Sequence, residues 1–267
     1  MLNLLRRLAD NRRRGSFANR LRQRRFRLFR ALVDSLLQDL PNGPLRGLPD
    51  GPPKGLDDGS YREVAGEALR KLAGGPPKGL DKGLPRPLKV IDVGGTEDFW
   101  RKMGITGEEG LEITLLNLSA VKTELPGFVG LAGDARNMSQ FPDQAFDVAF
   151  SNSVIEHVGG WADQQAMAAG MRRVGKRIFL QTPNRNFPIE PHFLFPFFQF
   201  LPVGWRIWLL MHFRLGWYPR HAGRESALQA VESVRLLTRH ELRTLFPGAT
   251  IVRERFMGLT KSFVVVG

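Results

Sequence analysis

The stretch "KVIDVGGTEDFW", residues 89–100, decides the fold class. It runs from apolar residues into an acid and then into two glycines, which is the pattern of a buried strand followed by a tight turn. A dinucleotide site needs the G-x-G-x-x-G spacing, because the pyrophosphate approaches backbone amides at a helix N-terminus. Here acids at positions 92, 97 and 98 surround the two glycines and would repel a pyrophosphate. The stretch therefore predicts an α/β nucleotide-type loop whose ligand is cationic and carries no phosphate.

Four more apolar runs follow the first one along the chain. With it, the predicted strands cover residues 88–93, 112–116, 128–131, 146–150 and 177–181. Segments able to form helices lie between several of them, notably 153–175, and this alternation predicts parallel strands buried on both faces. At the chain's end, "ATIVRERF" and "TKSFVVVG" with a short connection predict an antiparallel hairpin. We expect a doubly wound, Rossmann-like, mostly parallel seven-stranded sheet whose ligand sits at the carboxyl ends of the strands.

Each predicted parallel strand ends in glycine or polar residues. In chain order these are Asp92, Gly94 and Gly95; Asn117; Asp134 and Ala135; Asn152, Glu156 and His157; and Thr182 and Asn184. One such residue means little, because loops are polar in general. Five strand ends in series, all at the same edge of a parallel sheet, predict one shared site.

The segment from about 88 to 185 resembles the class I S-adenosylmethionine-dependent methyltransferases of the type 11, quinone-methylase-like group. The motifs that carry the resemblance are "VIDVGG", "LLNLSA", "GDA" and "FDVAFSNSVIEHV". The terminal hairpin also fits, since the seventh strand of that fold is antiparallel. The resemblance implies S-adenosylmethionine as the cofactor, and its sulfonium and ammonium groups agree with a cation-binding loop.

The resemblance also implies roles for the first two strand ends. Asp92, Gly94 and Gly95 match the positions that line the methionine half of the cofactor. Asn117 stands where the family usually has an acid that binds both ribose hydroxyls, so its grip is expected to be weaker. From the residues alone, the two glycines are also compatible with a simple tight turn and Asn117 with an Asx turn.

At the next two strand ends the implied roles concern the adenine and the base of the site. Asp134 would accept a hydrogen bond from the exocyclic amine, Ala135 would donate its backbone amide, and Asn152 would lie beneath the cofactor. The alternative for Asp134 is a helix N-cap. Glu156 and His157 follow Asn152 on the next helix, and their alternative is a surface pair at a helix start.

Residues 185–220 are the most aromatic part of the chain, and the prolines at 188, 191, 196 and 202 prevent one long helix. A helix is predicted over 204–213. The segment follows strand five, where methyltransferases of this type carry a substrate-covering insertion. Three interpretations stay open: a hydrophobic cover packed on the sheet, a pocket for a small apolar or lipid-like acceptor, or a patch that enters an anionic membrane surface. Arg206, Arg214 and Arg220 flank it, as expected near anionic headgroups.

The catalytic candidates are His157, His192 and Glu190. A histidine titrates near neutral pH and suits a general base for a hydroxyl acceptor, while the methyl group itself would move by direct in-line transfer. Glu190 and His192 lie in "FPIEPHF", near the expected mouth of the site, and the alternative is that their polar groups only satisfy the backbone of a proline-rich loop. The five histidines show no metal-ligand spacing such as H-E-x-x-H, so no metal is expected.

The chain before residue 88 divides into two segments. Residues 1–40 hold eleven Arg and three Asp, a net charge of +8 out of +13, and apolar residues at helical steps predict a basic amphipathic helix over about 21–40. It either packs beside the main domain or presents its arginines to anionic lipid or nucleic acid. Residues 41–87 contain "GPPKGLDDG" and "GPPKGLDKG" and read as a Gly/Pro-rich linker, leaving 88–267 as the methyltransferase domain.

Composition excludes several classes of function. Cysteine is absent, which rules out disulfides, thiolate metal sites and a cysteine nucleophile. The sequence has no signal-like apolar region and no membrane-spanning run, so we expect a cytoplasmic protein, peripheral at the inner face of a membrane if the basic and apolar segments bind lipid. Two other functions stay open. RNA methylation guided by the Arg-rich arm is less favoured because the acceptor side is apolar, and a non-catalytic cofactor-binding protein is suggested by the irregular first motif and Asn117. No oligomeric state is predicted.

Overall fold

The computed structural model describes residues 25–26, 29–30, 33, 87–105, 107 and 110–267. The predicted linker over 41–87 lies outside the described residues except for Pro87, and so does most of the predicted basic segment 1–40. Among the helices that are described, none combines the length and the apolar character that a membrane crossing requires.

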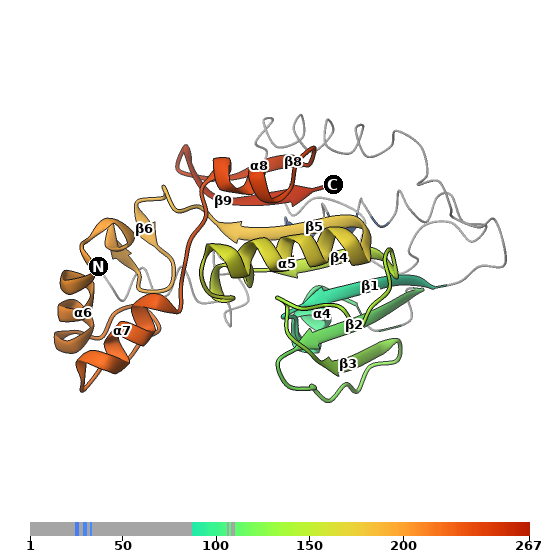
Figure 1. Cartoon of the computed structure of the whole chain (residues 1–267), viewed down its shortest axis with the longest axis horizontal. Helices are drawn as coiled ribbons and strands as arrows, with labels where there is room; N and C mark the ends of the chain where they lie inside the picture. The colour runs from blue at the N-terminus through green and yellow to red at the C-terminus, as the bar shows by residue number, and fades with distance from the viewer. Residues whose placement is uncertain (1–24, 27–28, 31–32, 34–86, 106, 108–109) are drawn as a thin grey trace.

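The centre of the domain is one seven-stranded sheet (Figure 1). Its strands are β1 (Leu88–Val93), β2 (Leu111–Asn117), β3 (Phe128–Ala132), β4 (Phe146–Asn152), β5 (Gly175–Pro183), β8 (Thr250–Phe256) and β9 (Leu259–Val266). They lie in the order β3-β2-β1-β4-β5-β9-β8. Strands β1 to β5 pair in parallel, whereas β9 pairs antiparallel with both β5 and β8. The predicted Rossmann-like sheet with an antiparallel C-terminal hairpin is therefore confirmed.

The helices and short strands between these elements have the following bounds. They are α4 (Glu97–Lys102), η1 (Ile155–His157), α5 (Trp161–Val174), β6 (Ile189–Glu190), β7 (Phe195–Pro196), η2 (Phe198–Phe200), α6 (Val203–His212), α7 (Arg224–Glu232) and α8 (Arg239–Leu245). The helix-forming segment 153–175 is divided into η1 and α5, and Gly159, which has a φ of +122°, lies between them. The Asp163 carboxylate then accepts a 2.8 Å hydrogen bond from the Gly160 amide, which begins α5.

Both faces of the sheet are covered, which explains why its strands read as nearly continuous apolar runs. Helices α5 and α8 pack on one face. On the other face, Trp100 of α4 meets helical residues from the N-terminal segment, and Phe29 lies 5.0 Å from Phe150 and 5.3 Å from Trp100 between ring centroids. Phe26 and Val33 are buried in the same cluster. Residues far ahead of the domain in sequence thus complete its core.

Helices α6 and α7 form a small lobe with a core of its own, and Figure 1 shows it beyond one end of the sheet. The helix predicted over 204–213 corresponds to α6. The lobe packs α6 against α7 through Ile207, Leu210, Ala227 and Val231, so the aromatic segment does not lie flat on the sheet as a cover.

Candidate active site

A cavity of about 600 Å³ opens at the carboxyl ends of β1 to β4. It is lined by Gly94, Leu116, Asn117, Leu118, Ser119, Gly133, Asp134, Ala135, Arg136, Val154, His157 and Val158. This is the edge where ligands bind in open α/β sheets, because strand ends and the loops after them converge there. Of the residues expected at the cofactor, the structure brings Gly94, Asn117, Asp134 and Ala135 to this cavity.

The two glycines of the opening motif are required for different reasons. Gly94 has a φ of +76°, and a Cβ atom there would lie 2.6 Å from both methyl groups of Val154. At Gly95 a Cβ atom would lie 1.6 Å from Oδ2 of Asp92. The turn therefore allows close approach of backbone and side chains, and Gly94 also lines the cavity.

Asp92 does not line the cavity, contrary to the sequence-based expectation. Its carboxylate is buried on the α4 side of the loop, where its Oδ2 accepts a 2.7 Å hydrogen bond from Nε1 of Trp100. Its Oδ1 has no hydrogen-bond partner among the described residues. Burial raises the pKa of Asp92 to about 7, and the Trp100 hydrogen bond offsets only part of that rise. The indole of Trp100 holds this acid inside the fold.

The two acids after the glycines also turn away from the cavity. Glu97 pairs with Arg101 and accepts hydrogen bonds from the backbone amides of Glu124 and Leu125. Slight burial opposes ionisation, but these donors hold the pKa of Glu97 below its usual value. Asp98 pairs with Lys102 along the same helix. Both acids therefore stabilise α4 and its neighbouring loop instead of shaping the ligand site.

Asn117 and Asp134 line the cavity with their side chains already engaged. The Asn117 amide donates a 2.9 Å hydrogen bond to the Gly95 carbonyl, which ties the end of β2 to the glycine loop. The Asp134 carboxylate accepts from the Arg136 backbone amide at 2.8 Å and pairs with its guanidinium. These hydrogen bonds, followed by the Arg136 charge, hold the pKa of Asp134 below its usual value. The carboxylate caps a turn and not a helix, and its role toward adenine stays a prediction.

Asn152 lies at the end of β4, where its side chain accepts a hydrogen bond from an arginine of the N-terminal segment. Arg25 Nη1 donates to Oδ1 of Asn152 at 2.6 Å and to Oε1 of Gln181 at 2.7 Å. The same guanidinium binds both carboxylate oxygens of Glu254, through Nε at 3.0 Å and Nη2 at 2.9 Å. Asn152 therefore does not line the cavity. Sequence reasoning missed Arg25, because nothing local distinguishes it from the ten other arginines around it.

The pair after β4 contains a buried acid that the sequence did not single out as buried. Glu156 is fully buried, and its Oε2 accepts a 2.9 Å hydrogen bond from Thr182. Burial raises the pKa of Glu156, and the charges of His192 and His157 oppose the rise only in part. His157 is exposed, lines the cavity, and has its Nδ1 3.1 Å from the Ser233 carbonyl oxygen.

Glu190 and His192, which belong to the insertion, lie beside Glu156 and His157. Glu190 is buried and accepts hydrogen bonds from the backbone amides of His192 and Phe193 at 2.7 and 2.6 Å. Its Oε1 also lies 2.6 Å from Nδ1 of His192. Burial alone would lower the pKa of His192, but the carboxylates of Glu190 and Glu156 raise it above its usual value. The ring centroids of His192 and His157 are 4.7 Å apart, so the three predicted catalytic residues form one cluster.

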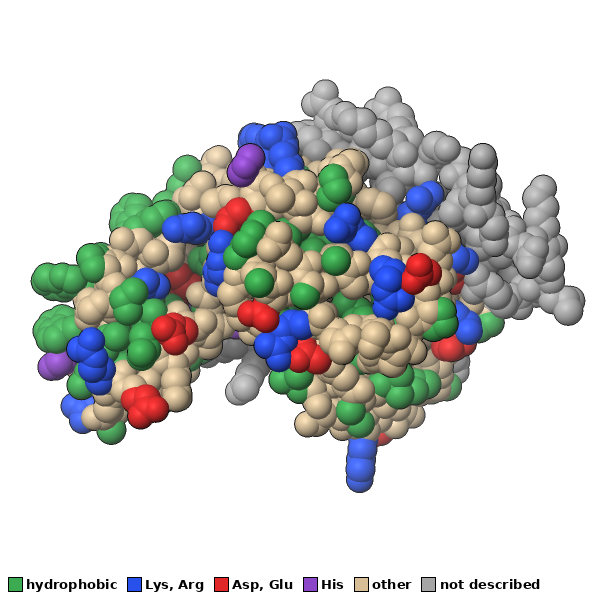
Figure 2. Space-filling view, in the orientation of Figure 1, with side chains coloured by type: hydrophobic (Ala, Val, Ile, Leu, Met, Phe, Trp, Pro, Cys, Tyr) green, Lys and Arg blue, Asp and Glu red, His purple; other side chains and the backbone are tan. Residues whose placement is uncertain are grey.

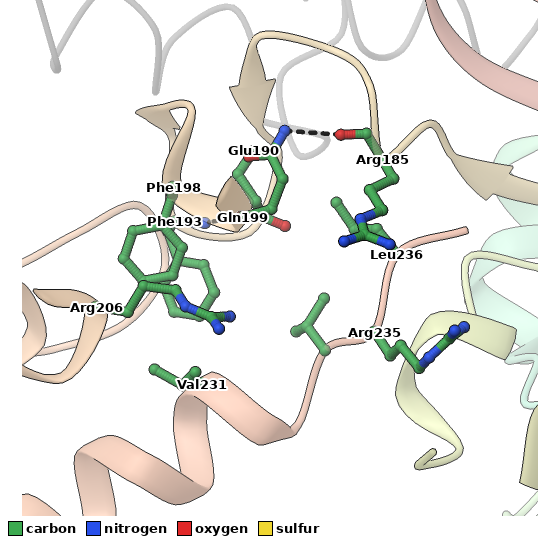
Figure 3. A pocket seen from close by; sticks show the side chains of 10 residues that line it. Arg185, Glu190, Phe193, Phe198, Gln199, Arg206, Val231, Arg235 and Leu236 are labelled. Carbon is green, nitrogen blue, oxygen red and sulfur yellow. Dashed lines mark hydrogen bonds between the residues drawn. The ribbon is translucent and has the colours of Figure 1, made fainter. Parts of the chain in front are cut away.

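A second cavity of about 190 Å³ lies between the insertion and the segment after α7 (Figure 3). Phe193, Phe198 and Val231 give it apolar walls, and Arg185 and Arg206 extend into it from different sides. Nε of Arg206 is buried with no hydrogen-bond partner in the described part of the chain. Burial and the charge of Arg185 together lower the pKa of Arg206.

A third arginine, Arg235, also lines this cavity, but it is already paired. It donates to Gln164 and Glu241 and stacks over Trp161. A pocket in residues 185–220 was one of the interpretations left open from the sequence, but the pairing of Arg185 with Arg206 could not be predicted, because the proline-rich stretch separates them and they meet only in the folded lobe.

Comparison with known proteins yields one family match and a set of distant structures. Residues 104–177 match the family model described as "Methyltransferase domain". No curated protein sequence matches the chain. A solved S-adenosylmethionine-dependent methyltransferase from Aquifex aeolicus is 14% identical, covers 69% of this chain and 83% of its own, and has a TM-score of 0.39.

Two further solved structures have similarly low sequence identities and TM-scores. The 1,6-didemethyltoxoflavin-N1-methyltransferase of Burkholderia thailandensis, solved with its substrate and S-adenosylhomocysteine, is 16% identical, covers 79% of this chain and 78% of its own, and has a TM-score of 0.40. A methyltransferase of Haloferax volcanii in complex with the activator Trm112 is 13% identical, covers 78% and 88%, and has a TM-score of 0.39.

The family match covers strands β2 to β4, helix α5 and the start of β5, which include most of the lining of the larger cavity. The strand order with an antiparallel C-terminal pair agrees with the same family. Residues 104–177 are thus similar to the methyltransferase domain family, and this similarity supports methyl transfer with S-adenosylmethionine as the cofactor.

Proposed function

We propose that the enzyme methylates an amphipathic, lipid-like acceptor with an anionic group, by direct in-line transfer from S-adenosylmethionine. The observation that carries this proposal is the arrangement of two cavities on either side of one histidine pair. His157 lines the cavity at the strand ends, while Glu190, which binds His192, lines the cavity of the insertion. The donor would occupy the first cavity and the acceptor would reach His157 and His192 from the second.

The acceptor side combines apolar walls with cationic side chains. Phe193 and Phe198 stack with ring centroids 4.1 Å apart, and Arg185 and Arg206 extend into the cavity beside them. Nε of Arg206 is buried without a hydrogen-bond partner among the described residues, which is costly, and an anionic ligand group would relieve that cost. This pairing of apolar and cationic surface fits a molecule with a hydrocarbon part and a carboxylate or phosphate.

The outer surface of the lobe supports an acceptor that resides in a membrane. Its exposed aromatic side chains are Phe197, Phe200, Trp205, Trp208, Phe213 and Trp217. Figure 2 shows hydrophobic side chains gathered over the region of α6. Tryptophan prefers the membrane–water interface, and the exposed Arg214, Arg220 and Arg224 are close in sequence to this face. We propose that this aromatic face docks on an anionic lipid surface and lets the acceptor enter the lobe.

The proposed reaction requires the protein to align donor and acceptor and to accept one proton. The methyl donor is already activated by its positive sulfur, so holding donor and acceptor in line supplies several kcal/mol of the barrier reduction. A hydroxyl acceptor would lose its proton to His157 or His192, its oxygen would bond to the methyl carbon, and the carbon–sulfur bond would break to leave S-adenosylhomocysteine. General-base assistance of this kind is typically worth about 10²–10⁴-fold.

The test uses the full chain with methyl-labelled S-adenosylmethionine and an extract of the native cells, separated afterwards into lipid, nucleic-acid and protein fractions. The proposal predicts label in the lipid fraction, and a strong decrease with the variant Arg206→Gln. Label confined to nucleic acid or protein would overturn the acceptor class while leaving methyl transfer intact. Arg172→Gln, which changes an exposed arginine of α5 that lines neither cavity and lies outside the lobe, is the matched control.

A further inference from the structure

Three potential metal ligands meet between the two cavities, although their sequence spacing follows no metal motif. A carboxylate oxygen of Glu156 and one ring nitrogen each of His157 and His192 all lie within 4.8 Å of one another. An ion at the centre of a triangle with sides of at most 4.8 Å would be at most about 2.8 Å from each ligand atom, and metal–ligand bonds to such groups are about 2.0–2.2 Å. Small side-chain rotations would therefore close the site.

The hydrogen bonds around the two histidines leave one ring nitrogen of each with a free lone pair. Nδ1 of His157 faces the Ser233 carbonyl oxygen, which can only accept, so Nδ1 carries the proton and Nε2 keeps its lone pair. Nδ1 of His192 is held in the same way by the Glu190 carboxylate at 2.6 Å. A ligand histidine that donates its other N–H to a carbonyl or a carboxylate is the usual arrangement around protein-bound metals.

Glu156 supplies a second, independent observation. The residue is fully buried, and while Oε2 accepts from Thr182, Oε1 has no hydrogen-bond partner in the described part of the chain. A buried carboxylate oxygen without a partner is expensive, and a cation bound to it would offset that cost. Thr182 orients the carboxylate in the way that outer ligands orient metal-binding acids.

We propose that Glu156, His157 and His192 form a binding site for a divalent first-row transition metal ion. Two imidazoles and one carboxylate suit Zn²⁺, Mn²⁺ or Fe²⁺ better than Mg²⁺ or Ca²⁺, which prefer oxygen ligands throughout. Three protein ligands leave coordination positions open, as in catalytic sites and unlike closed structural sites. This proposal departs from the expectation of no metal, which was based on histidine spacing in the sequence. That spacing could not reveal the site, because its ligands come from η1 and from a loop 35 residues later.

The metal has a direct use if the proposed methyl transfer holds. His157 lines the donor cavity, so the open positions lie where an acceptor oxygen would approach the methyl group. With the ion bound, the two imidazoles would be its ligands and could not also act as the base. A hydroxyl bound to the ion would instead lose its proton to solvent, because the metal stabilises the oxyanion that then attacks the methyl carbon. This role rests on the proposed function, whereas metal binding itself rests only on the three ligands and their hydrogen bonds.

The test is a titration of the chelator-treated full chain with Co²⁺, followed by its visible absorption and by calorimetry. We expect one equivalent to bind and to be displaced by Zn²⁺. His192→Ala and Glu156→Gln should each weaken binding by about a hundredfold or more, and Glu190→Gln by about 10- to 100-fold through loss of the hydrogen bond that orients His192. His212→Ala and His240→Ala, which remove histidines outside the cluster, should leave binding unchanged.

Two outcomes would overturn the proposal: a wild-type chain that binds no Co²⁺, or equal Co²⁺ affinity in the wild type and in the variant His192→Ala. If Glu156→Gln does not fold, His157→Ala provides the same comparison, because His157 is exposed and its loss should be tolerated. A parallel titration with S-adenosylmethionine separates the two proposals. Metal binding without cofactor binding would leave the metal site standing and remove the methyl-transfer role.

Discussion

The donor cavity and the insertion lobe are built in opposite ways. At the donor cavity, strand ends placed by parallel hydrogen bonding meet in a tightly interlocked loop, where Gly95 has no room for a methyl group beside Asp92. In the lobe, α6 and α7 pack on each other and leave large aromatic side chains exposed, with Trp205 at 63%. One region is held by close packing within the fold, whereas the other keeps large apolar side chains at its surface.

The interlocked loop should tolerate almost no added volume. In Gly95→Ala, the new Cβ would displace the Asp92 carboxylate and break its hydrogen bond to Trp100. Overpacking and an unsatisfied buried indole together should cost about 3–5 kcal/mol of the free energy of unfolding, measured by urea denaturation. Gly204→Ala in α6, where a Cβ would meet nothing within 4 Å, is the control and should be neutral or slightly stabilising. Equal changes in the free energy of unfolding at the two glycines would contradict the tighter packing inferred for the donor cavity.

The N-terminal segment belongs energetically to the interlocked region. Arg25→Met leaves Glu254 buried without its guanidinium, and breaking one side of such a pair should cost about 3 kcal/mol in urea denaturation. Arg101→Met, which removes a partner from exposed ion pairs on α4, should change the unfolding midpoint little. A small effect at Arg25 would mean that the segment is only loosely held.

Asp92 should make stability depend on pH. Its pKa is raised from 3.8 to about 7 in the folded state, so the folded protein holds a proton between these values that the unfolded chain has lost. Its contribution to stability is therefore present at low pH and is lost as the pH rises through 7. In Asp92→Asn this loss disappears, so the free energy of unfolding of the variant should gain about 2–3 kcal/mol on the wild type between pH 5 and pH 8. Parallel pH profiles would contradict the placement of this acid.

The smallest stability effect is expected in the lobe, where function should change instead. Trp205→Ser removes an exposed ring, so unfolding free energy should shift by about 0.5 kcal/mol or less. Co-sedimentation with vesicles containing an anionic lipid should nevertheless fall severalfold, because the ring would insert at the interface. Met257→Ser, which changes an exposed apolar side chain outside the lobe, is the control. Unchanged vesicle binding in Trp205→Ser would reject this face as a membrane contact.

The sequence predicted the sheet well because its information is local. Apolar runs gave β1 to β5 and the terminal hairpin, and the residues after them gave Gly94, Asn117, Asp134 and Ala135 at the cavity. The position of a residue at a strand end does not show whether its side chain points into the cavity or into the core. Asp92 follows the motif in sequence but turns toward Trp100, since the indole offers a buried donor.

The rest of the site depends on contacts between distant segments. Arg25 reaches Asn152 and Glu254 across the whole domain, and no pattern around it marks that choice. Glu156 and His192 meet because the insertion folds back over η1, and the burial of Glu156 is a consequence of that packing. Such pairings arise from tertiary structure and leave no periodic trace.

The most direct test of the central claim is calorimetric titration of S-adenosylmethionine into the full chain. The account predicts one binding site, about tenfold weaker in Asp134→Ala because a polar contact in the strand-end cavity is lost, and unchanged in Asp143→Ala. Asp143 is the matched control, since it also pairs with an arginine, Arg173, but lies outside that cavity. No binding by the wild type, or equal affinity in the wild type and both variants, would contradict the placement of the cofactor at the ends of β1 to β4.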